Sequence, residues 1–348
     1  MLIQPDEIVL VTGAAGFIGR SVVGTLLQQG FRTLRLTVRS SRGHAAIEEI
    51  ISKHGKDARI EICQGDLLSS TDCAAAARNV AVVYHLAAGT GEKSFAHLYM
   101  NSVLTTRNLL QACVHQGSLK RFVNVSSFAV YTNCNKPGGK VLDESCPVED
   151  DPVLRGEPYC FAKIKQDEIV MEYGRKHTIP YVIVRPGAVY GPGKNGITGR
   201  VGVGTFGVFL HLGGPNQLPL TYVDNCADAI VLAGLTEGAE GEIFNVVDDD
   251  LPSSRELLRL YKKNVKRFRT FYVPRVLSYL LCCVWENYSR WSQGQLPPTF
   301  NRKGWHAYWK GSKYSNAKIK KVGWKPRLST ADGLGRYLES CREYQQHA

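Results

Sequence analysis

The stretch Ile8-Val-Leu-Val-Thr-Gly-Ala-Ala-Gly-Phe-Ile-Gly19 decides the fold of this chain. Its apolar residues 8–12 are typical of a buried parallel strand, and glycines at 13, 16 and 19 then lead into a helix-forming run at 21–28. A strand, a glycine turn and a helix in this order aim backbone N–H groups at a phosphate, and the helix dipole favours its negative charge. The pattern therefore predicts a dinucleotide-binding unit, although its G-x-x-G-x-x-G spacing differs by one residue from the commoner G-x-G-x-x-G.

A second glycine pattern, Gly202-Val-Gly-Thr-Phe-Gly207, matches G-x-G-x-x-G letter for letter. No clean strand precedes it and no capped helix follows it, so it lacks the context that phosphate binding requires. It lies within a glycine-rich stretch from Gly191 to Gly214. We expect a mobile loop there and not a second nucleotide site.

Strand-like and helix-like segments alternate through the first part of the chain. Further strands are expected at 33–38, 59–63, 80–86, 121–126, 181–185 and 242–246, and helices at 44–54, 71–77, 99–115 and 158–176. This alternation predicts an α/β fold, a doubly wound parallel Rossmann sheet with a smaller, mainly helical C-terminal substrate domain. We expect the dinucleotide-binding domain over 1–186, with 221–249 returning to it, and the substrate-binding region over 187–220 and 250–348.

Length, charge and cysteine usage narrow the class of protein. The 348 residues carry a net charge of +12, have no signal-peptide pattern at the start and contain no apolar run long enough to span a bilayer. Ten cysteines show no metal-type C-x-x-C spacing, which indicates reduced thiols, a cytoplasmic protein and no metal site. Nucleic acid is not an expected partner, because the basic charge is spread out and does not form one stripe.

A basic cluster precedes the longest apolar segment, Val276 to Trp285, within an expected helix at 274–290 that follows another at 253–265. Such a pairing could rest on anionic lipid. We favour a solvated basic face beside an internal helix, so peripheral membrane contact is possible but not the expected arrangement. The cluster consists of Lys262, Lys263, Lys266, Arg267 and Arg269.

The pair Tyr159 and Lys163 lies four residues apart on an expected helix, so the two side chains share one face. An ammonium beside the phenol, together with an oxidised nicotinamide ring, would favour the phenolate and lower its pKa toward neutrality. Ser127, just beyond the strand at 121–126, could hydrogen-bond the substrate oxygen that Tyr159 protonates. A second Tyr-x-x-x-Lys pair, Tyr314 and Lys318, lies in the C-terminal basic region and lacks this context.

These motifs resemble the extended short-chain dehydrogenase/reductase family, the NAD-dependent epimerase/dehydratase group. The resemblance covers about residues 8 to 250, and seven motifs occur in the family's order. They are Thr12-Gly-Ala-Ala-Gly-Phe-Ile-Gly19, Gly65-Asp66-Leu67, Tyr84-His-Leu-Ala-Ala88, Ser126-Ser-Phe-Ala-Val-Tyr131, Tyr159-x-x-x-Lys163, Arg185-Pro-Gly-Ala-Val-Tyr-Gly-Pro192 and Tyr222-Val-Asp224.

The resemblance implies an NAD(P)-dependent dehydrogenase/reductase, with a homodimer as the expected assembly and a small molecule as the substrate. It assigns Ser127, Tyr159 and Lys163 as the catalytic triad, and Asn101 matches a helix position of the family. The residues expected to contact the cofactor are Gly13, Ala15, Gly16, Phe17, Ile18, Gly19, Arg39, Asp66, Leu67, Ala87, Ala88, Tyr159, Lys163 and Pro186.

The substrate prediction rests on departures from the sugar-nucleotide members of the family. Where those members hold a substrate diphosphate with Asn and Arg, this chain has Ala188 and Leu218, although Lys194, Arg200 or Arg255 could compensate. The segments 273–285, 313–318 and 322–326 resemble the 3β-hydroxysteroid dehydrogenase-like branch. We therefore expect alcohol–ketone interconversion on a lipophilic, steroid-, acyl- or polyketide-like substrate. The alternatives are a nucleotide-sugar epimerase or dehydratase and, from another class, a non-catalytic dinucleotide sensor.

The second strand and its end contain no acidic residue to hold the ribose 2′-hydroxyl of NAD. Arg39 lies there instead, and a guanidinium at this point can bind a 2′-phosphate. We therefore expect NADP(H) as the preferred cofactor, with NAD(H) possible.

Overall fold

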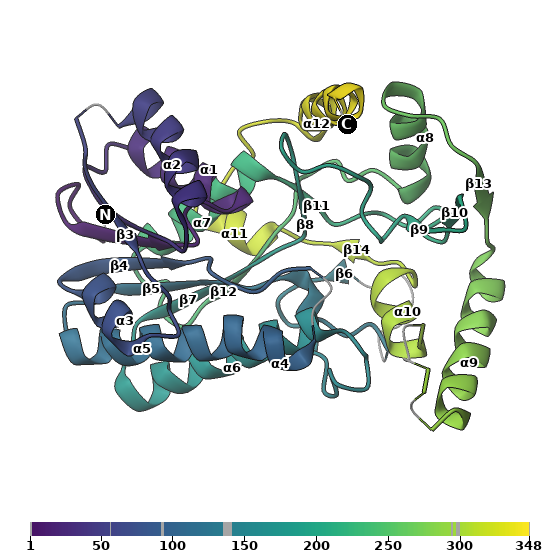
Figure 1. Ribbon diagram of the computed structural model, residues 1–348, viewed down its shortest axis with the longest axis horizontal. Helices are drawn as coiled ribbons and strands as arrows, with labels where there is room; N and C mark the ends of the chain where they lie inside the picture. The colour runs from purple at the N-terminus through teal and green to yellow at the C-terminus, as the bar shows by residue number, and fades with distance from the viewer. Residues whose placement is uncertain are drawn as a thin grey trace.

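A seven-stranded parallel sheet in the order β3-β2-β1-β4-β5-β7-β12 forms the centre of the computed structural model (Figure 1). The structure describes residues 2–55, 57–91, 94–134, 141–293, 295–296 and 300–347. The bounds of β1 and β2 are as predicted, and each of the other five strands differs by one residue. The strands are β1 (Ile8–Thr12), β2 (Thr33–Val38), β3 (Arg59–Gln64), β4 (Val80–His85), β5 (Arg121–Val125), β7 (Tyr181–Pro186) and β12 (Ile243–Val246).

Helices cover both faces of this sheet. Figure 1 shows α1 (Phe17–Gln28), α2 (Ser41–His54) and α7 (Val223–Leu235) on one side, with α3 (Ser70–Ala77), α5 (Thr105–Gln116) and α6 (Pro158–His177) on the other. Two apolar cores separate the sheet from the two helical layers. Because the central strands are buried on both faces, they read as continuous apolar runs and not as alternating ones. This is the predicted doubly wound arrangement.

The strand order reverses between β1 and β4. From β1 the chain proceeds outward through β2 and β3, and it then returns to add β4, β5, β7 and β12 on the other side of β1. Open parallel sheets bind ligands at the carboxyl ends of the strands beside such a switch point. The topology therefore predicts a ligand-binding site at the loops that follow β1 and β4.

The expected helix at 99–115 has a different beginning. A short α4 (Phe95–Leu98) leads into a π-helical turn over Tyr99–Leu104, and the regular helix α5 starts only afterwards. The hydroxyls of Thr105 and Thr106 both donate to the carbonyl oxygen of Ser102, at 3.0 and 2.6 Å. Side-chain donors compete in this way with the regular helical pattern, and such turns often occur at functional sites.

The expectation of a mobile loop at 202–207 is wrong, because this segment forms a β-hairpin. Strands β9 (Gly202–Thr205) and β10 (Val208–His211) pair antiparallel, and β13 (Thr270–Tyr272) adds a parallel third strand. The turn residues Phe206 and Gly207 have φ values of +44° and +75°. Two positive φ angles match the twist of a tight hairpin. The pairing with β13 comes from a segment more than 60 residues away, so the local pattern does not reveal it.

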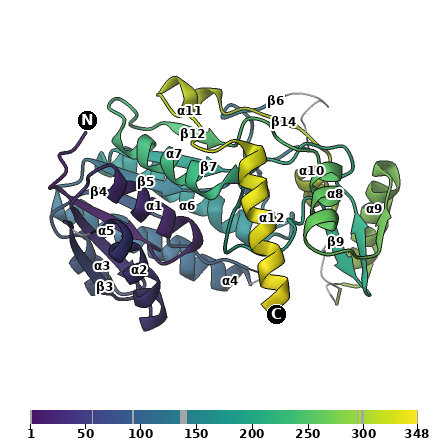
Figure 2. The same cartoon turned by 90° about the horizontal axis from the view of Figure 1, so that it is seen from above.

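The rest of the C-terminal part is mainly helical. It contains α8 (Ser254–Asn264), α9 (Arg275–Trp291), α10 (Arg302–Tyr308), α11 (Ala317–Lys321) and α12 (Thr330–His347). A short parallel pair, β6 (Val141–Leu142) with β14 (Lys313–Tyr314), connects it to the first part. A second short parallel pair, β8 (Ala188–Tyr190) with β11 (Leu220–Tyr222), lies between β7 and α7 in the chain. Figure 2 shows α12 running across the middle of the molecule, with α9 at the edge farthest from β3.

None of the described helices is both long and apolar enough to cross a lipid bilayer. The division into a dinucleotide-binding and a substrate-binding domain stays a prediction.

Candidate active site

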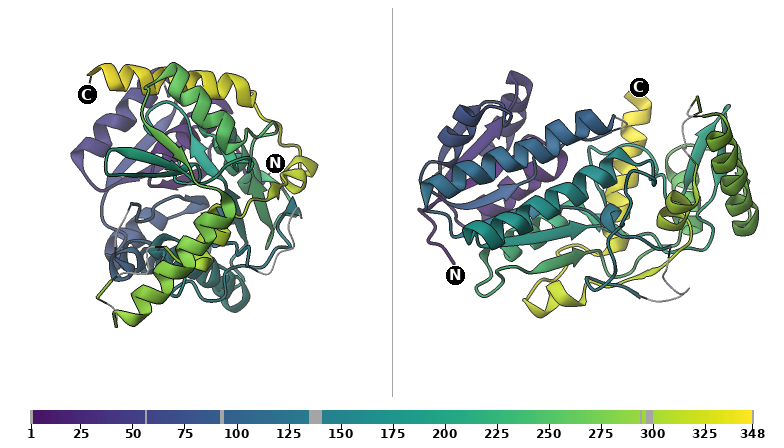
Figure 3. Two further views of the ribbon diagram at one scale, coloured as in Figure 1. Left: turned by 90° about the vertical axis from the view of Figure 1, so that its right-hand side faces the viewer. Right: turned by 90° about the horizontal axis from the view of Figure 1, so that it is seen from below.

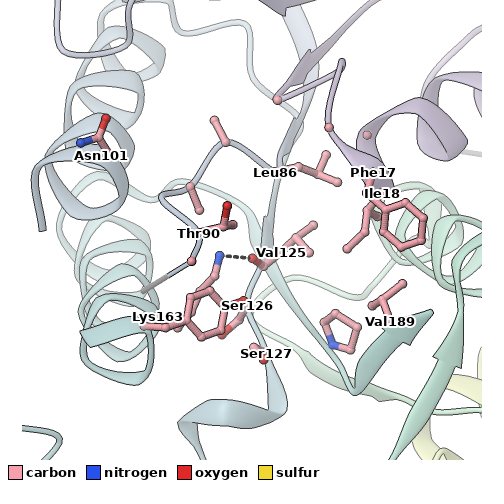
Figure 4. A pocket seen from close by; sticks show the side chains of 18 of the residues that line it. Phe17, Ile18, Leu86, Thr90, Asn101, Val125, Ser126, Ser127, Lys163 and Val189 are labelled. Carbon is pink, nitrogen blue, oxygen red and sulfur yellow. Dashed lines mark hydrogen bonds between the residues drawn. The ribbon is translucent and has the colours of Figure 1, made fainter. Parts of the chain in front are cut away.

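A cavity of about 940 Å³ opens at the carboxyl ends of the central strands (Figure 4). Every residue that the sequence analysis assigned to catalysis or cofactor binding lines it, from Gly13 and Arg39 to Ser127, Tyr159 and Pro186. Asn101, in the π-helical turn, also lines it. The fold therefore brings together residues that lie more than 170 positions apart in the chain, while their individual roles remain predictions.

The glycine turn after β1 has the geometry that a pyrophosphate requires. Gly13 has φ of +67°, and a Cβ there would lie 2.9 Å from the backbone nitrogen of Ala87. A Cβ at Gly19 would lie 2.2 Å from the carbonyl oxygen of Gly13, so only glycine permits this approach of α1 to the turn. Helix α1 begins at Phe17, and no side chain caps its first N–H groups. These groups border the cavity, and the site fits the diphosphate of a dinucleotide.

Strand β5 and helix α6 position the three candidate catalytic side chains. Ser127 follows β5, and its Oγ accepts a hydrogen bond of 3.1 Å from the backbone nitrogen of Ala129. Tyr159 is the second residue of α6, and Lys163 follows one turn later. The Lys163 Nζ lies 5.9 Å from the centroid of the Tyr159 ring and donates to the carbonyl oxygen of Val125 at 2.8 Å (Figure 4).

Burial controls the charges of this group. It raises the pKa of Tyr159 to about 12, against the opposing effect of a hydrogen bond with Ser127. It lowers the pKa of Lys163 to about 8. The expected lowering of the tyrosine pKa is therefore absent in the protein by itself, because desolvation of the phenolate outweighs the hydrogen bond with Ser127. A positive nicotinamide ring beside the phenol would act in the opposite direction.

The sequence analysis missed Asp167, which lies on α6 one turn beyond Lys163. Its buried carboxylate accepts hydrogen bonds from Asn124 and Ser126 at 2.9 Å each and from Arg185 Nη2 at 3.0 Å. Its charge raises the pKa of Lys163 against the effect of burial. The continued four-residue spacing through 159, 163 and 167 was the available signal for this residue.

Two further cations, Lys194 and Arg200, line the cavity. The Arg200 guanidinium lies 5.0 Å from the centroid of the Tyr308 ring, and the Lys194 Nζ lies 5.7 Å from the centroid of the Phe17 ring beside the glycine turn. Arg255 is elsewhere, over the ring of Tyr272 at 5.7 Å, and is not among the lining residues described. Tyr308, which sequence reasoning missed, comes from α10 and hydrogen-bonds to Glu157 beside the triad.

Arg39 lies immediately after β2 and lines the opposite end of the cavity, next to Ser40 and Gly43. Its Nη1 donates to Asn101 Oδ1 at 3.2 Å. This is the position from which a side chain reaches the adenosine ribose in Rossmann proteins.

The fold and cavity define a dinucleotide-binding protein of the Rossmann class. The chain belongs to the NAD dependent epimerase/dehydratase family, whose sequence profile matches residues 9–246. This confirms the resemblance noted from the motifs.

Individual relatives show how far the similarity extends. A trifunctional UDP-glucose 4,6-dehydratase/UDP-4-keto-6-deoxy-D-glucose 3,5-epimerase/UDP-4-keto-L-rhamnose-reductase of Arabidopsis thaliana is 24% identical over 95% of this chain and 46% of its own length. Cinnamoyl-CoA reductase 1 of Oryza sativa subsp. japonica is 31% identical over 53% of this chain and 54% of its own length. The chain thus spans about half the length of these curated relatives.

A solved structure supports the fold along nearly the whole chain. The UDP-glucuronic acid 4-epimerase from Bacillus cereus, in complex with UDP-glucuronic acid and NAD, superposes with a TM-score of 0.73 at 22% identity. The similarity covers 97% of this chain and 99% of that one. The architecture of the C-terminal part is therefore shared as well as that of the sheet.

Replacing Tyr159 by Phe should lower turnover by about two to four orders of magnitude, in line with the loss of a general acid–base. Cofactor affinity should stay nearly unchanged, because the ring remains. The control is Tyr314→Phe, which should be nearly neutral because Tyr314 lies on β14 and stacks on Phe128. Steady-state kinetics and cofactor titration test both variants; equal losses at the two tyrosines would refute the assignment.

Asp167→Asn should destabilise the protein by about 3–5 kcal/mol, because the Arg185 guanidinium would remain buried without its counter-charge. The neighbouring exposed pair provides the control. Glu168→Gln breaks the contact with Lys165 and should cost less than about 1 kcal/mol. Urea unfolding measures the change in the free energy of unfolding for both variants. Similar values would show that the buried pair stabilises the protein no more than the exposed pair does.

Proposed function

We propose that this chain is an NAD(P)-dependent enzyme that interconverts an alcohol and a ketone on the sugar of a nucleotide sugar, as epimerases and dehydratases do. The observation that carries the proposal is one cavity that the glycine turn, the triad and the two further cations Lys194 and Arg200 all line. The glycine turn suits the cofactor diphosphate. The cations Lys194 and Arg200 suit the diphosphate of a second nucleotide.

The roles of the side chains follow from their contacts. Tyr159 is the group that exchanges a proton with the substrate oxygen, and Ser127, which borders the same cavity, orients that oxygen. Lys163, held by the Val125 carbonyl, supplies the positive charge that favours the phenolate. The nicotinamide cofactor, when bound, supplies the acceptor or donor of hydride.

The preference for a lipophilic substrate is not supported by the cavity. That preference rested partly on the segment 273–285, yet none of the described residues of this segment lines the cavity. Leu218, read as a lost diphosphate ligand, is buried in an apolar cluster with Leu220 and Tyr222 and is also absent from the described lining. The relative that covers 95% of the chain acts on UDP-sugars by its name. The nucleotide-sugar alternative is therefore the better-supported one.

A second candidate is the reduction of an acyl-CoA. The similarity to cinnamoyl-CoA reductase has the higher identity, 31%, but extends over only 53% of the chain. A CoA thioester also carries a diphosphate, so the same two cations could hold it. The similarity to the UDP-sugar enzyme extends over 95% of the chain and so includes most of the expected substrate-binding region, which favours the nucleotide sugar over the CoA ester.

Calorimetric titration of the cofactor-loaded protein with UDP-glucose tests the substrate class. Arg200→Met and Lys194→Met should each weaken binding by about tenfold to a hundredfold, as expected for a lost charge-assisted hydrogen bond. Arg255→Met is the matched control and should leave the affinity unchanged, because Arg255 lies against Tyr272.

Chromatography of the products must accompany this titration, since epimerisation leaves the cofactor unchanged overall. Absence of UDP-glucose binding together with turnover of cinnamoyl-CoA would replace the sugar assignment by the second candidate. Absence of turnover with both, despite cofactor binding, would favour the sensor.

We further propose that NADP(H) is the preferred cofactor, since Arg39 borders the cavity where an acidic residue would hold NAD. Arg39→Asp should raise the Michaelis constant for NADPH about tenfold or more and spare that for NADH. Arg42→Asp makes the same charge change outside the described lining and should have little effect. A wild type that prefers NADH would refute the role of Arg39.

A further inference from the structure

Helix α9 has its large apolar side chains on the outside. Residues on this face are between 48% and 77% exposed, whereas the opposite, buried face carries Ser278, Cys282, Glu286 and Ser289. This is the reverse of an ordinary surface helix, which buries its apolar side. The exposed apolar residues of α9 are Val276, Leu277, Leu280, Leu281, Val284, Tyr288 and Trp291.

Hydrogen bonds on the buried side fix this orientation. Trp305 Nε1 donates to Ser278 Oγ at 3.0 Å, and Arg302 Nε donates to Glu286 at 3.0 Å. Ser289 Oγ donates to the carbonyl oxygen of Leu296 at 2.7 Å. Rotating the helix to bury its apolar face would break all three contacts and leave buried polar groups unpaired. The interpretation of this segment as an internal helix is therefore wrong.

The apolar face lies at one end of the molecule. Figure 3 shows α9 along the outer surface of that end, next to β13 and the hairpin of β9 and β10. Phe271 and Tyr272, directly before α9, are 60% and 49% exposed, and Phe206 at the hairpin turn is fully exposed. The end thus presents apolar side chains from three adjoining segments. Exposed apolar side chains that adjoin one another in this way mark an interaction site on a protein surface.

Positive charge borders this patch. Residues 257–300 contain eight Lys or Arg and a single acidic residue, Glu286, which is paired with Arg302. Lys263, Lys266, Arg267 and Arg269 are exposed. Within the described ranges none of these four side chains forms an ion pair. They are available to an anionic partner.

We propose that this end of the molecule docks on the surface of an anionic phospholipid membrane. The apolar side chains of α9 would enter the boundary of headgroups and acyl chains, and the basic cluster would contact lipid phosphates. A second copy of the chain fits less well, because two-fold pairing sets each patch against itself and so brings basic clusters together. The inference does not depend on the proposed substrate.

Cosedimentation of the full chain with vesicles tests the proposal. Phosphatidylcholine vesicles containing phosphatidylserine should bind the protein at low salt, with weaker binding at moderate salt, and pure phosphatidylcholine vesicles should bind it far less. Leu280→Ser/Val284→Ser and Lys263→Glu/Arg267→Glu should each weaken binding by about tenfold or more.

Two variants serve as matched controls. Lys321→Glu/Lys325→Glu makes the same charge change at exposed lysines around α11, and Tyr344→Ser removes an exposed aromatic ring from α12. Both should bind vesicles as the wild type does. Thermal unfolding and cofactor binding confirm that each variant is folded.

Three results would overturn the membrane assignment. The first is no binding to the anionic vesicles at low salt, and the second is equal binding by the α9 double variant and the wild type. The third is a wild-type dimer in analytical ultracentrifugation that the α9 variant converts to a monomer without any vesicle binding, which would assign the patch to a second copy. Each of these results leaves the calorimetric test of the proposed function unaffected.

Discussion

The arrangement of the candidate site depends on one buried carboxylate, that of Asp167. It binds Asn124 of β5, Ser126 directly after that strand and Arg185 of β7, so a single side chain of α6 is tied to two neighbouring strands. Isolated charges are costly to bury, and this one is offset by a guanidinium that is itself buried. Since Tyr159 and Lys163 lie on the same face of the same helix, this attachment also fixes their position relative to the end of β5.

The same carboxylate affects the chemistry through Lys163. Burial by itself would favour the neutral amine, and Asp167 opposes this by raising the pKa of the lysine. The hydrogen bond to the Val125 carbonyl further favours the ammonium, because an ammonium is the stronger donor. Lys163 can therefore hold a proton near neutral pH in a site where desolvation raises the pKa of Tyr159. Burial destabilises both the phenolate of Tyr159 and the ammonium of Lys163. The phenolate therefore depends most on a neighbouring positive charge in the same surroundings that make this charge unfavourable.

Much of the sheet and of the cavity could be predicted from the sequence, because the relevant signals are local. Strands buried on both faces give continuous apolar runs, and Gly13 and Gly19 occupy positions that leave no room for a Cβ. Parallel strands also direct their carboxyl ends to one edge, so residues that follow different strands meet there. The incorrect predictions concern segments whose structure depends on residues distant in the sequence. Pairing with β13 makes a strand of β10, and Leu218 lies in the core because it belongs to an apolar cluster that includes Leu257 and Leu334.

Helix α9 shows why a periodic apolar pattern does not determine whether the apolar face of a helix points to the core or to the outside. Apolar residues recur at helical spacing whether they face a core or an outside partner, so the spacing at 276, 280, 284 and 288 fits both cases. The contacts of the polar face decide the orientation of the helix. In α9 this face is fixed because Trp305 and Arg302 of α10 hydrogen-bond to Ser278 and Glu286. The same short helix carries Tyr308 into the cavity wall. Because α10 contacts α9 on one side and the cavity on the other, a partner bound to α9 would lie one helix away from the cavity.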